Sequence, residues 1–420
     1  MRLFRSPEPK LSATTGRENA MLHHFRYVTA GESHGKGLVT IVEGAPAGLP
    51  LDSETLRREL ARRQKGHGRG GRMKIERDAA EILSGVRLGK TLGSPIALSI
   101  PNRDWQNWQR AMSIDPLPDA SDSELRRVRL PRPGHADLVG LLKYDRRDAR
   151  DILERSSARE TAARVAAGAI AKRLLDEFEI GVASHVVSLA GVEARRLRPD
   201  EYPDDLNAAV EESPVRCLDR DAEARMIESI DAARSEGDTV GGVFEVVARN
   251  LPVGLGGHIS AETRLDGRLA WALMSIPAQK GVEIGLGFEA ARRRGSAVHD
   301  EIEADPDRRR SGGFRRRSNG AGGLEGGMTN GEPLVVRVAM KPLSTLMRPL
   351  QSVDLDTGEA AAAVRERSDV TAVPAAGVVG EAMIALVLAD AMREKFGGDS
   401  LGEMRANFEG YLDRLARRGG

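Results

Sequence analysis

The chain has 420 residues, 40% of them hydrophobic and 30% charged, which excludes collagen-like, mucin-like and wholly disordered proteins. Its 63 basic and 62 acidic residues leave a formal charge of +1, so no overall field steers it onto nucleic acid or an anionic membrane. The chain has only 15 aromatic residues, which argues against a base-stacking surface. Of the basic residues 53 are Arg, so any anion recognition must come from local clusters of Arg.

A single cysteine, Cys217, can form neither an internal disulfide nor a Cys-rich metal site, so we expect no metal and a reducing, cytoplasmic setting. The longest apolar stretch, 375–392, is interrupted by Glu381 and Asp390, and we expect no membrane span. Residues 1–20 lack the apolar core of a secretory signal. We expect them to be a disordered extension, with translation starting at Met1 or Met21. After this extension we expect a single large domain over 21–400 and a C-terminal helix or tail over 401–420.

The predicted elements mix strands and helices without strict alternation. Strands are expected at 39–46, 96–100 and 333–340, and strand patterns from 181 to 249 flank a charged helical region around 219–236. Helices are expected after an Asp52/Ser53 cap, from Ser157 with a capping box to Glu160, at 265–274 and at 380–396. A polar surface segment covers 104–124, while 292–318 and the last five residues look mobile. The pattern favours an α+β layered sandwich.

Two nucleotide-binding signatures nearly occur. Ser84–Thr91 (SGVRLGKT) ends like a phosphate-binding loop, but the first glycine is misplaced and a strand follows where a helix is needed. Gly285–Ala290 (GLGFEA) matches a dinucleotide-binding pattern, yet the residues after it do not predict the long helix of that unit. Neither segment is expected to bind a nucleotide in the way its motif suggests.

Six short segments carry residues suited to chemistry. Glycines that permit close backbone approach surround Ser33 and His34 in GESHG, and His135 follows a glycine in RPGHAD. Nine basic residues between 57 and 77 include Arg63, Arg69 and Arg72, whose forked guanidinium groups could converge on one phosphate. The remaining segments are RSSARE at 155–160, the glycine-rich stretch 319–331 leading to KPLST at 341–345, and Arg367-Ser368-Asp369. Each also has an ordinary structural explanation: a surface histidine, a solvated helix face, a helix cap or a flexible loop.

Taken together and in order, these motifs resemble the chorismate synthase family over residues 27–396. The resemblance implies a β-α-β sandwich, in which two sheets enclose helices, assembled as a homotetramer. It also implies a lyase that converts 5-enolpyruvylshikimate 3-phosphate to chorismate and phosphate by anti-1,4-elimination. The expected cofactor is reduced FMN, with NADPH as a possible source of reductant. Since no reductase-like domain is evident in the sequence, an external flavin reductase is the expected partner.

The resemblance also implies roles for individual residues. His34 would protonate the leaving phosphate, His135 would hold or donate a proton at the flavin, and Asp369 would help to remove the ring proton, while Ser33 and Ser157 would relay protons or orient these groups. The small anionic substrate or NADP would contact Arg63, Arg69, Arg72, Arg132, Arg159 and Arg367. The implied flavin contacts are Arg155, Ser156, Ser157, Pro277, Ala278, Gly326, Lys341, Pro342, Leu343, Ser344, Thr345 and Arg367.

Departures from the family pattern and competing hypotheses remain open. Gly320 stands where many relatives carry a basic residue, and Pro277 where some carry Asn, so those two side-chain contacts would be missing. A nicotinamide oxidoreductase using GLGFEA would bind NAD tightly without flavin. An RNA-binding protein using 57–77 and 308–317, where six Arg cluster, would show salt-sensitive affinity. The scarcity of aromatic residues argues against the RNA hypothesis.

Overall fold

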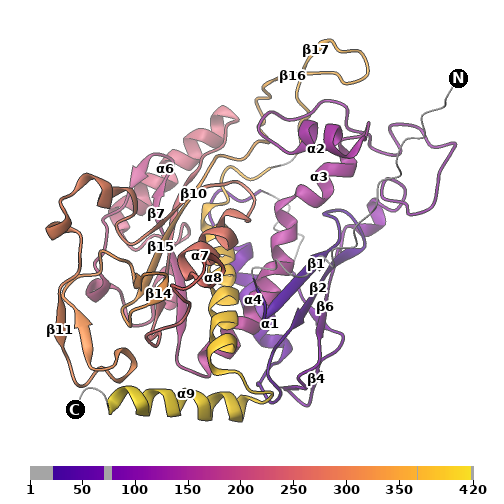
Figure 1. The fold of residues 1–420 in the computed structure, drawn as a ribbon. Helices are drawn as coiled ribbons and strands as arrows, with labels where there is room; N and C mark the ends of the chain where they lie inside the picture. Colours follow the sequence, from indigo (N-terminus) through magenta and orange to yellow (C-terminus); the bar gives the residue numbers. More distant parts are fainter. Residues whose placement is uncertain (1–21, 71–77, 367, 418–420) are drawn as a thin grey trace, which may run out of the picture.

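Two antiparallel sheets enclose a layer of helices in the computed structural model, which describes residues 22–70, 78–366 and 368–417 (Figure 1). The first sheet has the order β1-β2-β6-β3. Its strands are β1 Arg26–Ala30, β2 Gly37–Glu43, β6 Ile96–Pro101 and β3 Glu81–Ile82. Alternate residues of β2 are buried and exposed, which is the pattern of a sheet with one face on the core.

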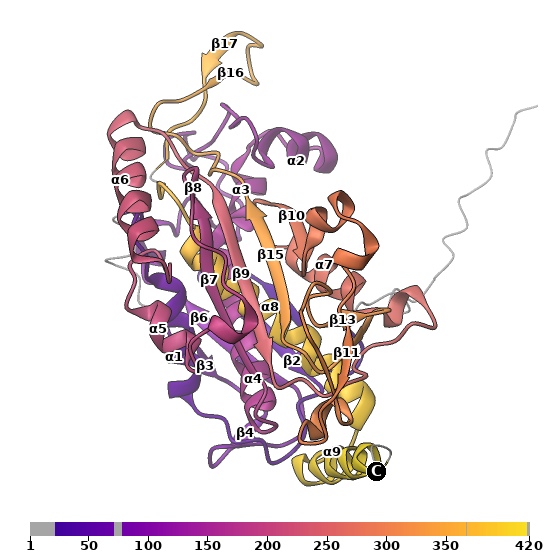
Figure 2. The same ribbon diagram turned by 90° about the vertical axis from the view of Figure 1, so that its left-hand side faces the viewer.

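The second sheet has the order β10-β15-β9-β7-β8, and every pairing in it is antiparallel. Its strands are β7 Gly181–Leu189, β8 Val192–Glu193, β9 Gly242–Arg249, β10 Gln279–Ile284 and β15 Leu334–Met340. Figure 2 shows this sheet in front of α8 and the first sheet behind them. The layers confirm the predicted α+β class and the implied β-α-β sandwich.

Helices α1 Ser53–Gln64, α4 Thr161–Asp176, α7 Leu265–Met274 and α8 Val373–Phe396 lie between or beside the sheets. Helix α4 packs against the first sheet and α8 against β7 and β9 of the second. The two helices approach closely, because a Cβ on Gly168 would lie 2.3 Å from the Cβ of Ala382. By length and composition α8 could cross a membrane, but its apolar window is wholly buried, so its composition reflects its place in the core.

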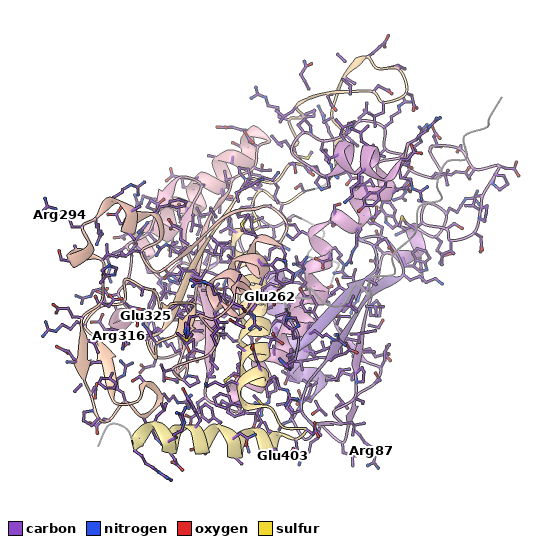
Figure 3. The ribbon with its side chains drawn as sticks, in the orientation of Figure 1. Arg87, Glu262, Arg294, Arg316, Glu325 and Glu403 are labelled. Carbon is purple, nitrogen blue, oxygen red and sulfur yellow. The ribbon has the colours of Figure 1, made fainter. Side chains whose placement is uncertain are left out.

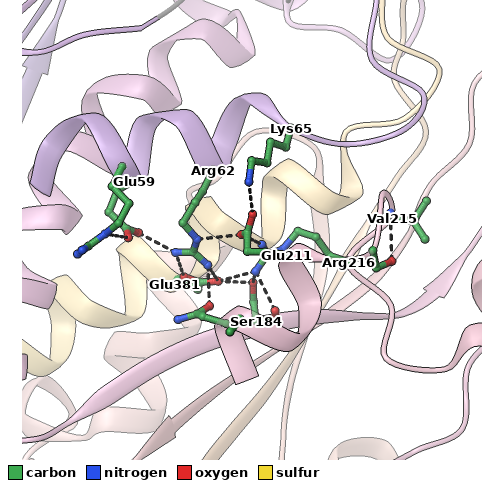
Figure 4. Close-up of polar contacts among 12 residues, drawn as sticks. Glu59, Arg62, Lys65, Ser184, Glu211, Val215, Arg216 and Glu381 are labelled. Atoms are coloured by element: carbon green, nitrogen blue, oxygen red, sulfur yellow. Dashed lines mark hydrogen bonds and ion pairs between the residues drawn. The ribbon is translucent and has the colours of Figure 1, made fainter. Parts of the chain in front are cut away.

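Glu381, one of the acidic residues of α8, is fully buried among cations (Figure 4). Arg62 donates to it at 2.8 and 2.9 Å, Arg216 at 3.0 Å, and Lys172 and Ser184 also donate to it. Burial alone would raise the pKa of Glu381, but the charges of Arg62, Lys172 and Arg216 hold it well below its ordinary value. The carboxylate therefore joins α8 to α1, α4 and the second sheet.

Asp390, a second buried acidic residue of α8, holds the beginning of the described chain. One of its oxygens accepts hydrogen bonds from the backbone N–H groups of His23, His24 and Phe25, at 3.0, 2.5 and 2.7 Å. Its other oxygen pairs with the buried guanidinium of Arg268 on α7. The two residues that interrupt the apolar stretch in the sequence are thus fully paired ions of the core.

The remaining elements decorate this sandwich. The other helices are α2 Asp137–Tyr144, α3 Arg150–Ser156, α5 Leu206–Glu211, α6 Arg220–Glu236 and α9 Leu401–Ala416. Two-stranded hairpins are formed by β4 Val86–Arg87 with β5 Lys90–Thr91, β11 Ile302–Ala304 with β12 Phe314–Arg316, β13 Leu324–Glu325 with β14 Met328–Thr329, and β16 Gln351–Val353 with β17 Ala360–Ala362. Arg316 and Glu325, labelled in Figure 3, join two of these hairpins through two hydrogen bonds of 2.9 Å.

Several local predictions are confirmed and three are wrong. The helix capped by Asp52, the strand from Ile96 and the helices at 219–236 and 265–274 are all present. Neither nucleotide motif leads into a long helix, because a hairpin (β4–β5) holds SGVRLGKT and a short 3-10 helix, Gly287–Arg292, begins within GLGFEA. The segment 292–318 is not an irregular loop but contains β11 and β12, held by Arg–Glu pairs such as Arg315–Glu303.

The other two corrections concern helix starts. Ser157 caps a 3-10 turn, Ala158–Glu160, and α4 begins only at Thr161. Helix α8 begins at Val373 instead of residue 380, because Gly377 and Gly380 are helical positions that let the helix approach Ser184 and Phe244 of the second sheet. In both cases tertiary contacts overrule a local signal. The predicted extension 1–20 and the final residues 418–420 lie outside the described residues.

Candidate active site

His34 lies in the loop between β1 and β2, where two elements hold its ring. Its Nδ1 is 2.9 Å from both carboxylate oxygens of Glu154 on α3, and its backbone N–H donates to the same carboxylate at 2.9 Å. The imidazole stacks on the indole of Trp108 with ring centroids 3.7 Å apart. The neighbouring Ser33 is buried and donates its backbone N–H to the carbonyl of Glu154 at 3.0 Å.

Glu154 is almost completely buried and remains an anion. Burial would raise its pKa, but the hydrogen bond from His34 and the charges of His34 and Arg150 outweigh burial and lower it. Arg150, one helical turn earlier on α3, donates to Glu154 at 2.8 Å. Since an ionised carboxylate only accepts hydrogen bonds, the facing Nδ1 of His34 carries a proton.

His135 forms a second histidine–carboxylate pair at the start of α2. Its Nδ1 lies 2.6 Å from Asp137, which is fully buried and also accepts from Arg132 Nε at 2.9 Å and from the Arg132 backbone N–H at 3.0 Å. Burial would raise the pKa of Asp137, but hydrogen bonds from His135 and Arg132 hold it well below its ordinary value. Asp137 therefore orients both the histidine and the arginine of RPGHAD.

The KPLST segment lies against this loop. Lys341 donates to the carbonyl of Gly134, and Arg132 donates to Thr345 Oγ1 at 2.9 Å. The backbone N–H of Lys341 donates at 3.0 Å to Ala278, which adopts a positive φ of 68°. Burial, reinforced by the charge of Lys280, lowers the pKa of Lys341. Of the five predicted segment residues (Lys341, Pro342, Leu343, Ser344, Thr345), Lys341 thus contacts Ala278 and the RPGHAD loop, and Thr345 contacts Arg132 of the same loop.

Arg63 and Arg159 meet at a shared carboxylate, Asp78. Arg63 donates to Asp78 at 3.2 Å and to Thr161 at 3.0 Å, and Arg159 forms a closer pair with the same aspartate. All three charged side chains are buried, so this carboxylate holds both guanidinium groups inside the protein. Ser157, which accepts from the backbone N–H of Arg159 at 3.3 Å, lies beside them.

Further predicted site residues lie at the end of α3 and around Asp369. Arg155 donates to the carbonyls of Gly31 and Thr29 at 3.1 and 2.9 Å, so it lies on the GESHG loop. Ser156 donates its hydroxyl back to Ile152. Asp369 pairs with Arg69 at 3.0 Å and accepts from the backbone N–H of Gly70 at 2.6 Å.

Glu366 joins the two histidine centres. Its carboxylate lies 3.6 Å from Arg150, which supports Glu154, and 3.9 Å from Arg132, which supports Asp137. No feature of the sequence singled out Glu366, although it directly precedes the RSD motif. Arg72 and Arg367, both predicted to bind anions, lie outside the described residues.

Gly326 is the predicted residue that no described contact links to the others. It lies in the β13–β14 turn with a φ of 59°, and the nearest atoms to its missing side chain belong to Met328 and His258. Among residues 22–70, 78–366 and 368–417, no group of three or more His, Cys, Asp and Glu side chains could hold a metal ion.

Sequence reasoning missed five supporting residues: Arg150, Glu154, Trp108, Asp78 and Glu366. The i,i+4 spacing of Arg150 and Glu154 beside RSSARE was the one available signal, because such a pair on a short helix suggests a fixed carboxylate. The assembled site has two histidines with buried carboxylates, surrounded by arginines. This arrangement can transfer protons near neutral pH beside a bound anion.

The comparisons with known proteins agree with this arrangement. A family model described as chorismate synthase matches residues 25–393. Chorismate synthase of Symbiobacterium thermophilum is 60% identical over 396 residues, which cover 94% of this chain and 100% of that protein. The Aquifex aeolicus protein of the same name is 56% identical over 400 residues, covering 94% and 99%. A crystal structure of a chorismate synthase superimposes with a TM-score of 0.75 at 46% identity, covering 94% of this chain and 99% of that one. The chain therefore belongs to the chorismate synthase family of shikimate-pathway lyases.

Proposed function

We propose that the enzyme converts 5-enolpyruvylshikimate 3-phosphate to chorismate and phosphate by anti-1,4-elimination, in the presence of reduced FMN. The observation that carries this proposal is the pair of histidines, each fixed through Nδ1 by a buried carboxylate, within a set of arginines. Loss of phosphate from an anionic substrate needs a proton donor at the leaving oxygen and positive charge around the substrate. Both are available in this site.

In this proposal His34 protonates the leaving phosphate and His135 holds a proton at the flavin. Asp369, which Arg69 and the Gly70 amide keep in place, helps to take the ring proton. Ser33, which precedes His34 in its loop, and Ser157, which follows α3, orient these groups. The substrate anions bind to Arg63, Arg69, Arg72, Arg132, Arg159 and Arg367.

The residues proposed for the flavin fit a phosphorylated, planar ligand. Cations, hydroxyls and backbone groups converge where Lys341, Thr345 and Ala278 meet the RPGHAD loop. Lys341 and Arg155 would neutralise the flavin phosphate, while the Ser344 and Thr345 hydroxyls would donate hydrogen bonds to it. Ser156, Ser157, Pro277, Pro342, Leu343, Gly326 and Arg367 would complete the contacts. Reduced FMN, when bound, would supply an electron-rich ring for the elimination without net oxidation or reduction.

We further propose a cytoplasmic homotetramer that receives reduced flavin from an external reductase, with NADPH as an alternative reductant. The outer face of the first sheet supports self-association, since Val28, Val39 and Ile41 are 62, 39 and 37% exposed and lie on one surface. An exposed apolar sheet surface of this kind, with the Arg26–Glu43 ion pair at one end, suits an isologous contact with a second copy.

The test is an anaerobic assay. Purified protein with photoreduced FMN should release phosphate from 5-enolpyruvylshikimate 3-phosphate and form chorismate in equal amounts. Absence of turnover under reduced, oxygen-free conditions would refute the proposed reaction. A parallel assay with FMN and NADPH as the sole reductant decides whether the external reductase is required: turnover there removes the need for it.

A further inference from the structure

The ring of His34 is held on one nitrogen and one face, while its other nitrogen makes no hydrogen bond to a residue that the structure describes. Glu154 occupies Nδ1, and the Trp108 indole covers the ring. Within the described parts of the chain Nε2 has no hydrogen-bond partner. His34 is slightly exposed, at 12% of its side chain, whereas Glu154 is exposed by only 2%. The ring of His34 is therefore held from its buried side by Glu154 and Trp108, and Nε2 is the ring nitrogen that this support leaves open.

We propose that Glu154 and Trp108 are positioning residues for His34, fixing Nδ1–H toward the protein and the plane of the ring, so that Nε2 delivers the proton to the leaving phosphate. This inference rests on the proposed elimination. In the step, the ring C–H proton goes to the base and its electron pair forms the new double bond. The allylic C–O bond then breaks, and its electron pair goes to the phosphate oxygen that takes the proton from His34 Nε2. The neutral imidazole that remains is reprotonated from solvent.

The charges around His34 explain why a carboxylate is needed there. The facing groups are Glu154 and Arg150 on α3, Arg126 and Asp104 on the Trp108 segment, and Glu366 behind Arg150. Arg126 lies 4.0 Å and Arg150 5.1 Å from the Trp108 ring centroid. Both arginines bring positive charge to this stack, and Glu154 is the carboxylate that contacts the imidazole. The stacked indole fixes the plane of the ring.

The fold contains a matched constellation outside the site. On the outer face of the second sheet, His185 Nε2 lies 2.9 Å from Glu245, which also faces Arg337 at 3.4 Å. The three side chains stand side by side in the strand register, and all are buried. This second histidine–glutamate–arginine set, made of the same residue types, is a control for the general cost of neutralising a buried glutamate.

The first test compares E154Q with E245Q in the full-length enzyme with reduced FMN. We expect E154Q to lower kcat about tenfold or more and to move the basic limb of the kcat–pH profile about one pH unit lower, with KM little changed. The E245Q variant should lose stability but keep the wild-type profile. Superimposable profiles for E154Q and wild type, or an equal shift in E245Q, would overturn the proposal. In an H34Q background, E154Q should cause no further loss of kcat.

The second test does not depend on turnover. In protein labelled with 15N-histidine, the His34 signals, identified by their loss in H34Q, should show a protonated Nδ1 and ring protons shifted upfield by the indole. The upfield shift should disappear in W108L and persist in part in W108F, and kcat should fall in W108L and recover in W108F. Unshifted ring protons or an unprotonated Nδ1 in the wild type would refute the positioning role. If the wild type shows these signals yet releases no phosphate, the proposed reaction fails instead.

Discussion

Replacement of Glu381 by Gln tests whether the buried ion cluster stabilises the sandwich. The cluster holds three carboxylates, Glu59, Glu211 and Glu381, against three cations, Arg62, Lys172 and Arg216. The substitution keeps the shape of the side chain but leaves one uncompensated positive charge in the core. Removing one partner of a buried ion pair typically costs about 3–5 kcal/mol. Because two carboxylates remain in the cluster, we expect a loss in free energy of unfolding at the lower end of this range, about 3 kcal/mol.

The effect should also depend on pH in a defined direction. Because the pKa of folded Glu381 is held below its ordinary value, its contribution is fully present above the unfolded pKa of about 4.3. That contribution is lost as the pH falls toward the lower folded pKa. The difference in free energy of unfolding between wild type and E381Q should therefore be largest near neutral pH and shrink below about pH 4.

Urea unfolding followed by circular dichroism, at one fixed protein concentration, measures this difference. The control is E54Q, because Glu54 pairs with Arg57 on the exposed side of α1, where side-chain exposures are 63 and 61%. This control should leave the unfolding midpoint unchanged. A loss below about 1 kcal/mol in E381Q at pH 7, or an equal loss at about pH 3 and pH 7, would contradict the account of the cluster.

Three further predictions concern packing, the chain start and the chemistry. Gly168→Ala should destabilise by about 1–3 kcal/mol, because its new Cβ would lie 2.3 Å from that of Ala382, and Ala382→Gly should recover only part of the loss in urea unfolding, since the backbone Cα and O of residue 382 would still lie 2.6 and 3.0 Å away. Asp390→Asn should speed amide hydrogen exchange of residues 23–25, since a neutral acceptor holds their N–H groups less firmly. Unchanged exchange would contradict the role of Asp390 in holding these residues. Alanine at His34 or His135 should lower turnover by about a hundredfold with the circular dichroism spectrum intact, whereas near-wild-type rates in both variants would make these histidines structural.

Local signals predicted those parts of the fold that local interactions determine. The Asp52 cap, which accepts from the Thr55 backbone N–H at 2.8 Å, and the amphipathic residues behind it define α1 without help from the rest of the chain. The start of α8 could not be predicted in this way. Gly377 and Gly380 are poor helix formers in isolation, and only contact with Ser184 and Phe244 makes small residues favourable there.

The candidate site likewise contains residues that local sequence signals reveal and residues that they do not. His34 and His135 stand out in the sequence because glycine loops present them, and their carboxylate partners differ in how visible they are. Asp137 is two residues from His135, whereas Glu154 is 120 residues from His34. Trp108 looked like part of a surface segment, and only the folded chain buries it against a catalytic candidate. Partners that are close only in space leave no local pattern to read.

The position of α8 in the chain has a consequence for biosynthesis. The helix begins at Val373, so both sheets and α4 leave the ribosome before the element against which they pack. The nascent chain must therefore hold its inner sheet faces exposed until translation is nearly complete, which is a state prone to aggregation. Closure then depends on contacts of very long sequence separation, such as Asp390 with Phe25, 365 residues apart. Early truncation of the message would thus release a chain that lacks its core helix, and such a product should be a substrate for chaperones and proteases.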